Sequence, residues 1–325
     1  MKPVHIKMKI AGLTVLFVGM CFGVFAQEKN DAIKVFNEGV ELMKANDPRA
    51  VESFENCIRI CEQIGDSAAD IKLKAIKVLP DLYYQKAFDL LTIEKNIDGA
   101  LNASKKTLEV ANKYNDAQTK ESTEKLMIQA YSTKASSFVT SKENEKAIMT
   151  FDSVLAINPE HTVSIYNKAL IYRGMSNNAK FTESIDLYIE KMQAAGDKDK
   201  AEQAMKIARD YFRIAGGKAN QGNKLTDAVS LLATASKYGA DKNVHYQYAS
   251  VYNKQKKFDL AIENAKKGLE LETGTPEDKA KFYFELAQAQ FGKGQTADAC
   301  EAYKNAMYGP FLQAAKAQRT NLKCQ

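Results

Sequence analysis

A short pattern of small and bulky residues returns along most of this chain. Its clearest copy is Ala147, Phe151 and Val154 followed by Pro159, and weaker copies are Ala50-Phe54-Cys57, Ala228-Leu232-Ala235, Ala261-Ala265-Gly268 and Ala299-Tyr303-Ala306. Positions i, i+4 and i+7 lie on one face of a helix, so the small residue allows a second helix to approach while the bulky residue fills the space beside it. The pattern therefore predicts helical hairpins that bury their apolar faces by stacking on one another.

The small residues that open each copy predict about seven repeats in an all-α fold. They are Ala50, Ala100, Ala147, Ser184, Ala228, Ala261 and Ala299, at intervals of 50, 47, 37, 44, 33 and 38 residues. No segment shows the alternation typical of a strand. Pro80 interrupts a long helical pattern over residues 68–91, and its ring is expected to kink or split that helix because it removes a backbone donor.

Beyond residue 26, nearly all of the chain resembles the tetratricopeptide repeat family, strongly from about residue 125 to 308 and best from Met127 to Tyr188. The residues that carry the resemblance stand where the family places aromatic, small, aromatic, small, aromatic and proline residues: Tyr131, Ala135, Phe138, Ala147, Phe151 and Pro159. The chain departs from the family in having no Trp, and Ala mostly replaces Gly where helices cross. The resemblance implies an α-solenoid with degenerate, lengthened repeats over residues 27–124, regular repeats over 125–308 and a capping helix over 309–325.

The first 26 residues have the features of a secretory signal peptide. Basic residues precede an uncharged apolar run from Ile10 to Phe25, which ends at Ala26. The run is about 16 residues long, whereas a membrane-spanning helix needs about 20, which argues against a retained anchor. A lipid anchor on Cys21 is disfavoured because Met20 stands where such a signal requires a small residue. The prediction is a periplasmic or secreted protein, without stable membrane insertion once the signal has been cleaved.

The charge of the chain does not favour a nucleic-acid partner. The formal net charge is +6, and removal of Lys2, Lys7 and Lys9 with the signal lowers it to about +3. The arginines are scattered along the sequence, whereas nucleic-acid-binding proteins gather basic residues on one face. The lysines are interpreted as solvated helix faces.

Four cysteines remain after signal removal. Cys300 and Cys324 flank the turn that contains Gly309-Pro310, where antiparallel helices would bring them close, and they are a candidate disulfide. Two free thiols are the alternative. Cys57 and Cys61 lie four residues apart on one helix, where a bridge is poorly oriented, and their oxidation state stays open. A metal site is not expected, because no His or second Cys pair lies near them.

No enzyme motif is apparent in the sequence. Only His161 and His245 remain after signal removal, and neither has an acidic partner at a motif spacing. The pair Gly216-Gly217 lacks the preceding strand of a dinucleotide-binding loop and is interpreted as a site of close helix packing. The chain is therefore predicted not to be an enzyme and to need no cofactor or metal. A hydrolase or transferase is the disfavoured alternative.

The family resemblance implies a concave groove lined by the first helix of each hairpin. The residues expected there are the aromatic residues Tyr166, Tyr246 and Phe284 and the polar residues Arg173, Ser250, Asn253 and Gln288. The alternative for the three rings is half-buried packing between adjacent first helices. The predicted function is a protein-interaction scaffold or adaptor in the bacterial cell envelope, with a protein or peptide partner of unknown identity. The alternative function is a structural subunit that assembles with copies of itself.

Overall fold

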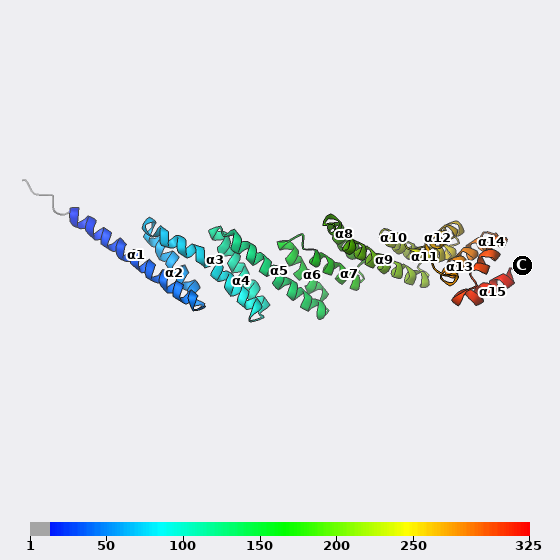
Figure 1. Ribbon diagram of the computed structural model, residues 1–325, viewed down its shortest axis with the longest axis horizontal. Coiled ribbons are helices and arrows are strands. Elements are labelled where there is room, and N and C mark those ends of the chain that lie inside the picture. Colours follow the sequence, from blue (N-terminus) through cyan, green and yellow to red (C-terminus); the bar gives the residue numbers. More distant parts are fainter. Residues whose placement is uncertain (1–13) are drawn as a thin grey trace, which may run out of the picture. The chain divides into compact units, whose positions relative to one another are not determined.

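The computed structural model describes residues 14–325, with side chains from residue 29 onward. These residues form fifteen α-helices and two short 3-10 helices, without a strand (Figure 1). The all-α, α-solenoid prediction is confirmed. The helices belong to two compact units, one ending at Ile171 and the other beginning at Tyr172. The first half of the predicted signal peptide lies outside the described residues, and none of the described helices is long and apolar enough to cross a membrane.

The first unit consists of hairpins in which each helix packs against the next one in the chain. Its helices are α1 Thr14–Lys44, α2 Arg49–Ile64, α3 Ala69–Thr92, α4 Ile97–Tyr114, α5 Ala117–Thr140 and α6 Asn144–Ile157, with the 3-10 helix η1 Asp66–Ala68 before α3. Helix α7, Thr162–Gly174, contains the division between the units. The predicted boundary between degenerate and regular repeats, at residues 124 and 125, lies inside α5.

The second unit continues the same construction. Its helices are α8 Asn178–Ala194, α9 Lys198–Gln221, α10 Leu225–Ser236, α11 Lys242–Lys254, α12 Phe258–Leu271, α13 Pro276–Gly292, α14 Thr296–Asn305 and α15 Leu312–Asn321, with the 3-10 helix η2 Gly309–Phe311 before α15. Helices α3, α5 and α9 have 24 residues each, whereas α11 has 13, so lengthened helices occur in both units.

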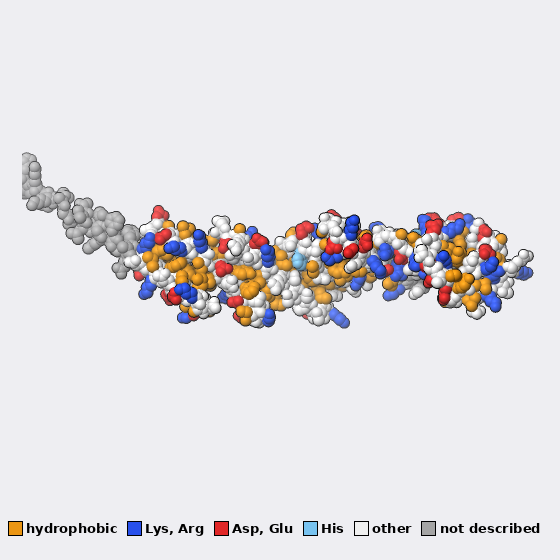
Figure 2. All heavy atoms as spheres, in the orientation of Figure 1, with side chains coloured by type: hydrophobic (Ala, Val, Ile, Leu, Met, Phe, Trp, Pro, Cys, Tyr) orange, Lys and Arg blue, Asp and Glu red, His pale blue; other side chains and the backbone are white. Residues whose placement is uncertain are grey.

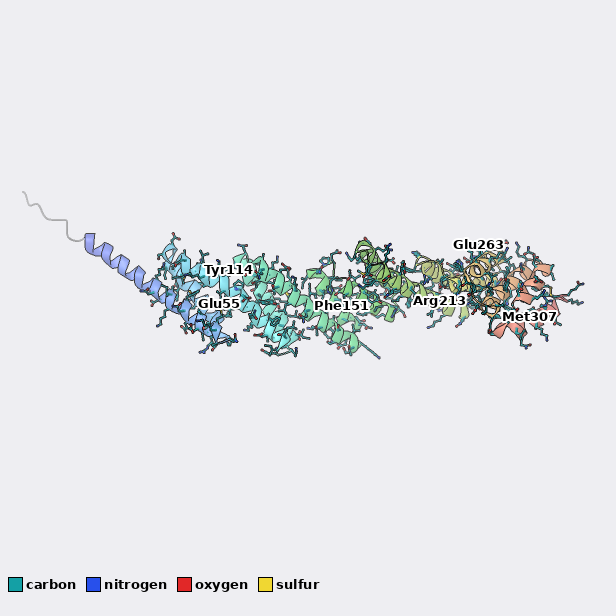
Figure 3. The ribbon with its side chains drawn as sticks, in the orientation of Figure 1. Glu55, Tyr114, Phe151, Arg213, Glu263 and Met307 are labelled. Atoms are coloured by element: carbon teal, nitrogen blue, oxygen red, sulfur yellow. A yellow bond between two sulfur atoms is a disulfide. The ribbon has the colours of Figure 1, made fainter. Side chains whose placement is uncertain are left out.

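The repeated pattern marks the second helix of each hairpin. Its small residue, which we call the crossing residue, is buried in all five copies, and so are the two residues that follow it in the pattern. Phe151 of α6 is one of these buried residues (Figure 3). Local spacing places the three side chains on one helix face, and burial against the first helix stabilises the hairpin.

The crossing residue of α8 is Phe181, and the prediction of Ser184 was wrong. Phe181 is fully buried, whereas Ser184 is only partly buried. A large ring fits here because it packs against two aromatic residues of α9, with ring centroids 5.0 Å from Tyr211 and 5.7 Å from Phe212. With Phe181 in place, the interval from Ala147 becomes 34 residues, the length of the standard repeat.

A left-handed residue lies in the turn between the two helices of each hairpin. These residues are Asn46, Lys95, Lys142, Ser176, Asn223, Lys256 and Gly294, with φ between 52° and 79°. From Lys95 onward, each stands five positions before the crossing residue, and Ser176 has this spacing to Phe181. Lysine has no particular preference for this conformation. The turn is therefore imposed by the packing of the two helices it joins.

Polar side chains at several helix starts explain where those helices begin. Asn96, Asp116, Asn177 and Asp197 each accept a hydrogen bond from the backbone N–H three residues later. Thr275 and Asp278 form a reciprocal capping box at the start of α13, with Pro276 in the first turn. These caps satisfy backbone donors that have no partner inside the helix.

Pro80 does not split its helix. Helix α3 runs from Ala69 to Thr92 through the buried proline, so the part of the prediction that proposed two helices was wrong. Its neighbour Leu79 belongs to a core that also includes Phe54 of α2 and Ile71 of α3. Tertiary packing compensates for the lost backbone hydrogen bond.

The described cysteines differ in redox state: two form a disulfide and two are free thiols. Cys300 of α14 and Cys324, just beyond α15, form a disulfide with a Cα–Cα distance of 5.6 Å. Cys57 and Cys61 are free and buried in the core of α2. Burial raises the pKa of the Cys57 thiol to about 12, so this sulfur stays protonated at neutral pH and is a poor nucleophile.

Candidate functional site

The first helices of three successive hairpins lie side by side in the second unit. Helix α11 contacts both α9 and α13, while α10, α12 and α14 pair with these helices from the other layer. The crossing residues Ala228, Ala261 and Ala299 set a common register for the three hairpins. Eight positions before them stand Asn220, Asn253 and Phe291, at equivalent places on α9, α11 and α13.

A hollow of about 520 Å³ opens on α11 and α13, and we call it the groove. Its lining residues are Ser250, Asn253, Lys254, Phe258, Glu285, Gln288, Phe291 and Gly292. Three of them, Ser250, Asn253 and Gln288, are residues that the sequence predicted to line a groove. The structure therefore brings these three together, and it adds a buried carboxyl group and two aromatic rings that the sequence analysis did not include.

A chain of hydrogen bonds links the first helices behind the groove. The Nδ2 of Asn220 donates to Ser250 Oγ at 3.3 Å, and the Nζ of Lys254 donates to the Asn220 carbonyl oxygen at 2.8 Å. The Nδ2 of Asn253 donates to Glu285 twice, to its carbonyl oxygen at 2.9 Å and to its Oε2 at 2.8 Å. The side-chain oxygens of Asn220 and Asn253 are buried and have no donor. The amide groups are thus held in place while one acceptor on each stays unused.

Glu285 is the least solvated charged residue of the groove. Its exposed fraction is 7%, and burial raises the pKa of its carboxyl above the usual range. Hydrogen bonds from Asn253 and Ser250 and the charge of Lys254 oppose this increase. Glu285 has no ion pair among the described side chains within 4.0 Å, because the Lys254 ammonium is directed to the end of α9. A carboxyl group buried without a cation destabilises its charged form.

Replacement of Glu285 by glutamine is expected to make unfolding less dependent on pH. A folded-state pKa above the unfolded value means that Glu285 favours folding below the ordinary glutamate pKa of about 4.3, and that this contribution is lost as pH rises through the folded value. Wild type should therefore lose thermal stability relative to Glu285→Gln as pH increases, measured as the difference in midpoint at each pH. Glu301→Gln, on the exposed side of α14, is the matched control. A constant difference between wild type and Glu285→Gln across the pH range would contradict this expectation.

Two of the predicted groove rings are engaged in packing. Tyr246 and Phe284 are half-buried, and their ring centroids lie 6.0 Å from Phe282 and 5.7 Å from Tyr303, respectively. Phe284 also packs against Phe311 of the terminal segment, at 5.4 Å. These contacts agree with the alternative expectation for the rings, half-buried packing, rather than with a free ligand platform. Ser250, Asn253 and Gln288 are therefore the better probes of the groove.

Tyr166 and Arg173 are half-buried residues of α7. Tyr166 belongs to the first unit and Arg173 to the second, since the division lies between Ile171 and Tyr172. Neither residue lines the groove of α11 and α13. They stay predictions for a groove formed by other hairpins.

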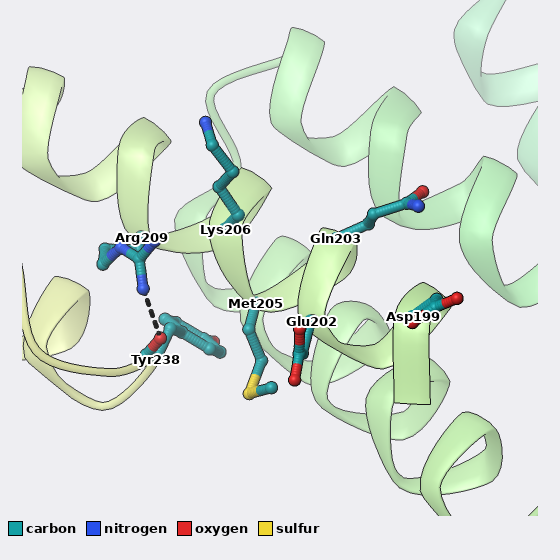
Figure 4. A pocket seen from close by; sticks show the side chains of 7 residues that line it. All are labelled: Asp199, Glu202, Gln203, Met205, Lys206, Arg209 and Tyr238. Atoms are coloured by element: carbon teal, nitrogen blue, oxygen red, sulfur yellow. Dashed lines mark hydrogen bonds between the residues drawn. The ribbon is translucent and has the colours of Figure 1, made fainter. Parts of the chain in front are cut away.

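A second hollow, of about 440 Å³, lies along the first turns of α9. Tyr238 lines one side of it (Figure 4). The other six lining residues belong to α9: Asp199, Glu202, Gln203, Met205, Lys206 and Arg209. Its cations already have partners, because Lys206 pairs with Asp210 at 2.7 Å and Arg209 donates to the Tyr238 carbonyl oxygen at 3.1 Å. The groove of α11 and α13 is the stronger candidate because it combines a buried carboxyl group with unused acceptors.

Charge on the described surface is mixed. Figure 2 shows basic and acidic side chains interspersed on the visible face of each unit. The two histidines among the described residues form hydrogen bonds, His161 with Ser164 and His245 with Asn264, each at 2.9 Å. No group of three or more potential metal ligands occurs among the described residues.

Sequence reasoning missed Asn220, Lys254 and Glu285. A signal existed for Asn220, since it precedes Asn253 by 33 residues, the same interval that separates Ala228 from Ala261. Nothing in the sequence distinguishes Glu285 from the many solvated glutamates. Its burial depends on the neighbouring hairpin.

Stacked helical hairpins whose first helices form a common layer define the class of α-solenoid repeat proteins. Residues 243–274, which span α11 and α12, match the sequence model of the tetratricopeptide repeat. The chain therefore contains a tetratricopeptide repeat at these residues, as the sequence pattern predicted. No curated protein matches the chain significantly.

Several solved structures of this fold are similar to the chain at low identity. A tetratricopeptide repeat protein from Parabacteroides merdae is 16% identical, with 91% of this chain and 99% of that one covered and a TM-score of 0.29. YrrB, described as a TPR protein with an unusual peptide-binding site, is 17% identical over 67% of this chain and 99% of its own, with a TM-score of 0.34. The TPR2AB domain of yeast Sti1, in a complex with pHSP90, is 16% identical over 76% and 94%, with a TM-score of 0.29. All three TM-scores are below 0.5, so these similarities do not indicate what this chain binds.

Proposed function

We propose that this protein is a non-enzymatic scaffold or adaptor of the bacterial cell envelope that binds a segment of a partner protein in the groove. The observation that carries the proposal is the groove itself. Side chains of α11 and α13 line it, and unused buried acceptors from α9 and α11 adjoin it. Tetratricopeptide repeats present such surfaces on stacked, mutually supporting hairpins.

The groove is preorganised for binding. Asn220, Ser250, Asn253 and Lys254 are already held by hydrogen bonds between neighbouring helices. A partner segment therefore does not have to order these side chains when it binds, which lowers the entropic cost of association. The helical backbone has used its own donors and acceptors, so recognition must come from side chains.

Export is supported by two features of the chain. The apolar run from Ile10 to Phe25 follows basic residues and ends at Ala26, as in a secretory signal peptide. The disulfide between Cys300 and Cys324 fits an oxidising compartment such as the periplasm.

Substitution of Gln288 by arginine is expected to abolish capture of the partner, because the long charged side chain fills the groove. The measurement is affinity capture from an envelope extract with the full chain, read by quantitative mass spectrometry. Gln313→Arg, an identical change on the exposed side of α15, is the matched control. Wild type and Gln313→Arg should recover the same partner, and Gln288→Arg should recover at least about tenfold less.

Other outcomes would contradict the proposal in different ways. Equal recovery with Gln288→Arg would show that the partner does not use the groove. Recovery of the protein alone, with a larger mass by light scattering, would favour the self-assembling structural subunit that the sequence left as the alternative.

A further inference from the structure

The groove contains a carboxyl group that lacks a cation. Glu285 lines the hollow, is 7% exposed, and receives its hydrogen bonds from uncharged groups. Lys254 also lines the groove, but its ammonium group donates to the last turn of α9, where the helix dipole favours a positive charge. A buried acid of this kind is costly for the free protein, and a cation supplied by a ligand would remove that cost.

Two further acceptors lie in the same hydrogen-bonded chain. The side-chain oxygens of Asn220 and Asn253 are buried without a donor, and the two amide nitrogens are already used by Ser250 and Glu285. A ligand that enters here must bring donors and no acceptors. This requirement excludes carboxylate and phosphate groups and favours a group with several N–H donors.

Aromatic rings form the apolar part of the groove lining. Phe291 of α13 is 47% exposed, which is unusual for a phenylalanine, and Phe258 of α12 lines the hollow beside it. A planar guanidinium group can stack on such a ring, and its aliphatic stem adds apolar contact. Lysine has a compact, strongly hydrated charge with three donors, whereas arginine has five donors in a plane.

We propose that the groove contains a subsite for an arginine side chain of the partner segment, in which Glu285 receives the guanidinium group, the side-chain oxygen of Asn253 accepts one of its N–H donors and Phe291 stacks on its plane. This inference rests on the proposed function and specifies the chemistry of the partner. The subsite distinguishes ligand side chains by their charge, their number of hydrogen-bond donors and their planarity. It therefore binds arginine most tightly, lysine more weakly and neutral isosteres of arginine most weakly.

The test uses the full chain and acetylated, amidated Ala/Ser heptapeptides that differ only at the central residue. That residue is arginine, lysine or citrulline, the neutral isostere of arginine, and binding is measured by isothermal titration calorimetry. Wild type should bind the arginine peptide at least about thirtyfold more tightly than the citrulline peptide, because a fully desolvated charge pair is lost in the latter. The lysine peptide should lie between them.

Glu285→Gln keeps the shape and the Asn253 contact of Glu285 but removes its charge. This variant should bind the arginine and citrulline peptides equally, while the control Glu301→Gln keeps the wild-type preference. Phe291→Ala removes an exposed ring and should weaken arginine binding about two- to fivefold. Circular dichroism confirms that each variant is folded.

Proton release provides an independent readout of the same contact. The charged group that faces Glu285 is Lys254, and the neighbouring titratable groups are Tyr246 and Tyr303. A bound cation lowers the pKa of Glu285, so the arginine peptide should release protons on binding, and its affinity should fall as pH decreases below the free-state pKa. Calorimetry in buffers of different ionisation enthalpy measures this release, which Glu285→Gln should abolish.

The outcomes separate this inference from the proposed function. Equal affinity of wild type for the arginine and citrulline peptides, or no binding of either, overturns the arginine subsite. If partner capture still depends on Gln288 in that case, the scaffold function stands. If wild type shows no preference for the arginine peptide and partner capture does not depend on Gln288, both the arginine subsite and the proposed scaffold function are overturned.

Discussion

Replacement of Phe282 by alanine is expected to lower the free energy of unfolding of the second unit by about 3–5 kcal/mol, the usual cost of removing a buried phenylalanine ring. Phe282 has no exposed surface and joins three helices. Its ring belongs to α13, lies against Gly268 of α12, and meets Tyr246 of α11 edge to face at 6.0 Å. The loss should therefore appear as faster amide hydrogen exchange in all three helices, with a smaller effect on α9, because each repeat contacts only its neighbours.

Phe291→Ala is the matched control for this prediction, since it removes the same ring from the same helix at an exposed position. Its free energy of unfolding should change by about 0.5 kcal/mol or less. Urea unfolding of both variants, followed by circular dichroism, measures the difference. Similar losses for the two variants would mean that Phe282 does not hold the hairpins together.

A double-mutant cycle with Gly268 identifies the contact. A Cβ atom at this glycine would lie 2.3 Å from Cε1 of the Phe282 ring, so Gly268→Ala alone should destabilise the protein by about 1–3 kcal/mol. In the Phe282→Ala background the ring is absent, and the same substitution should cost little. Additive effects would contradict this account of the close approach.

Loss of the disulfide between Cys300 and Cys324 is expected to destabilise the C-terminal segment by about 3 kcal/mol, because the bond closes a stretch of 24 residues in the unfolded chain. Arg319 reinforces the same closure by donating to the Cys300 carbonyl oxygen at 2.6 Å. The variant that carries Cys300→Ser and Cys324→Ser should show faster hydrogen exchange in α15 and near-native exchange in α9, since nearest-neighbour packing confines the effect.

Dithiothreitol provides the control for the disulfide prediction. Wild type should lose stability when the reagent is added, whereas the double serine variant should not respond. In a protein that begins at residue 27, the oxidised form has Cys57 and Cys61 as its free thiols, and thiol titration of the denatured, non-reduced protein should count two. A count of four, or a wild type that is insensitive to reduction, would contradict the presence of the bond.

The fold could be predicted from the sequence because its signals are local. Crossing residues such as Ala147 and Ala299 share a helix face with the bulky residues four positions later, and this spacing acts within one helix turn. The same argument failed at α8, where an aromatic residue takes the crossing position. A phenylalanine fits there because its ring packs against Tyr211 and Phe212 of the next hairpin.

The candidate site was predictable in part. Ser250, Asn253 and Gln288 follow from the repeat register, which determines the face of the first helix on which a side chain lies. The register alone could not show that Tyr246 and Phe284 contribute to packing between hairpins, or that Lys254 is directed to α9. These orientations depend on the distance between neighbouring first helices, and no local pattern encodes that distance.

The sequence by itself determined that this protein is a stack of helical hairpins with a common register, because helix periodicity and residue size act over a few neighbouring positions. The tertiary structure alone decided which polar residues become functional candidates. Glu285 resembles the solvated glutamates of this chain in sequence, yet packing of α13 against α11 removes it from water and leaves its carboxyl group without a cation. Burial of a charge depends on surfaces contributed by distant residues, which is the physical reason that only the folded chain reveals it.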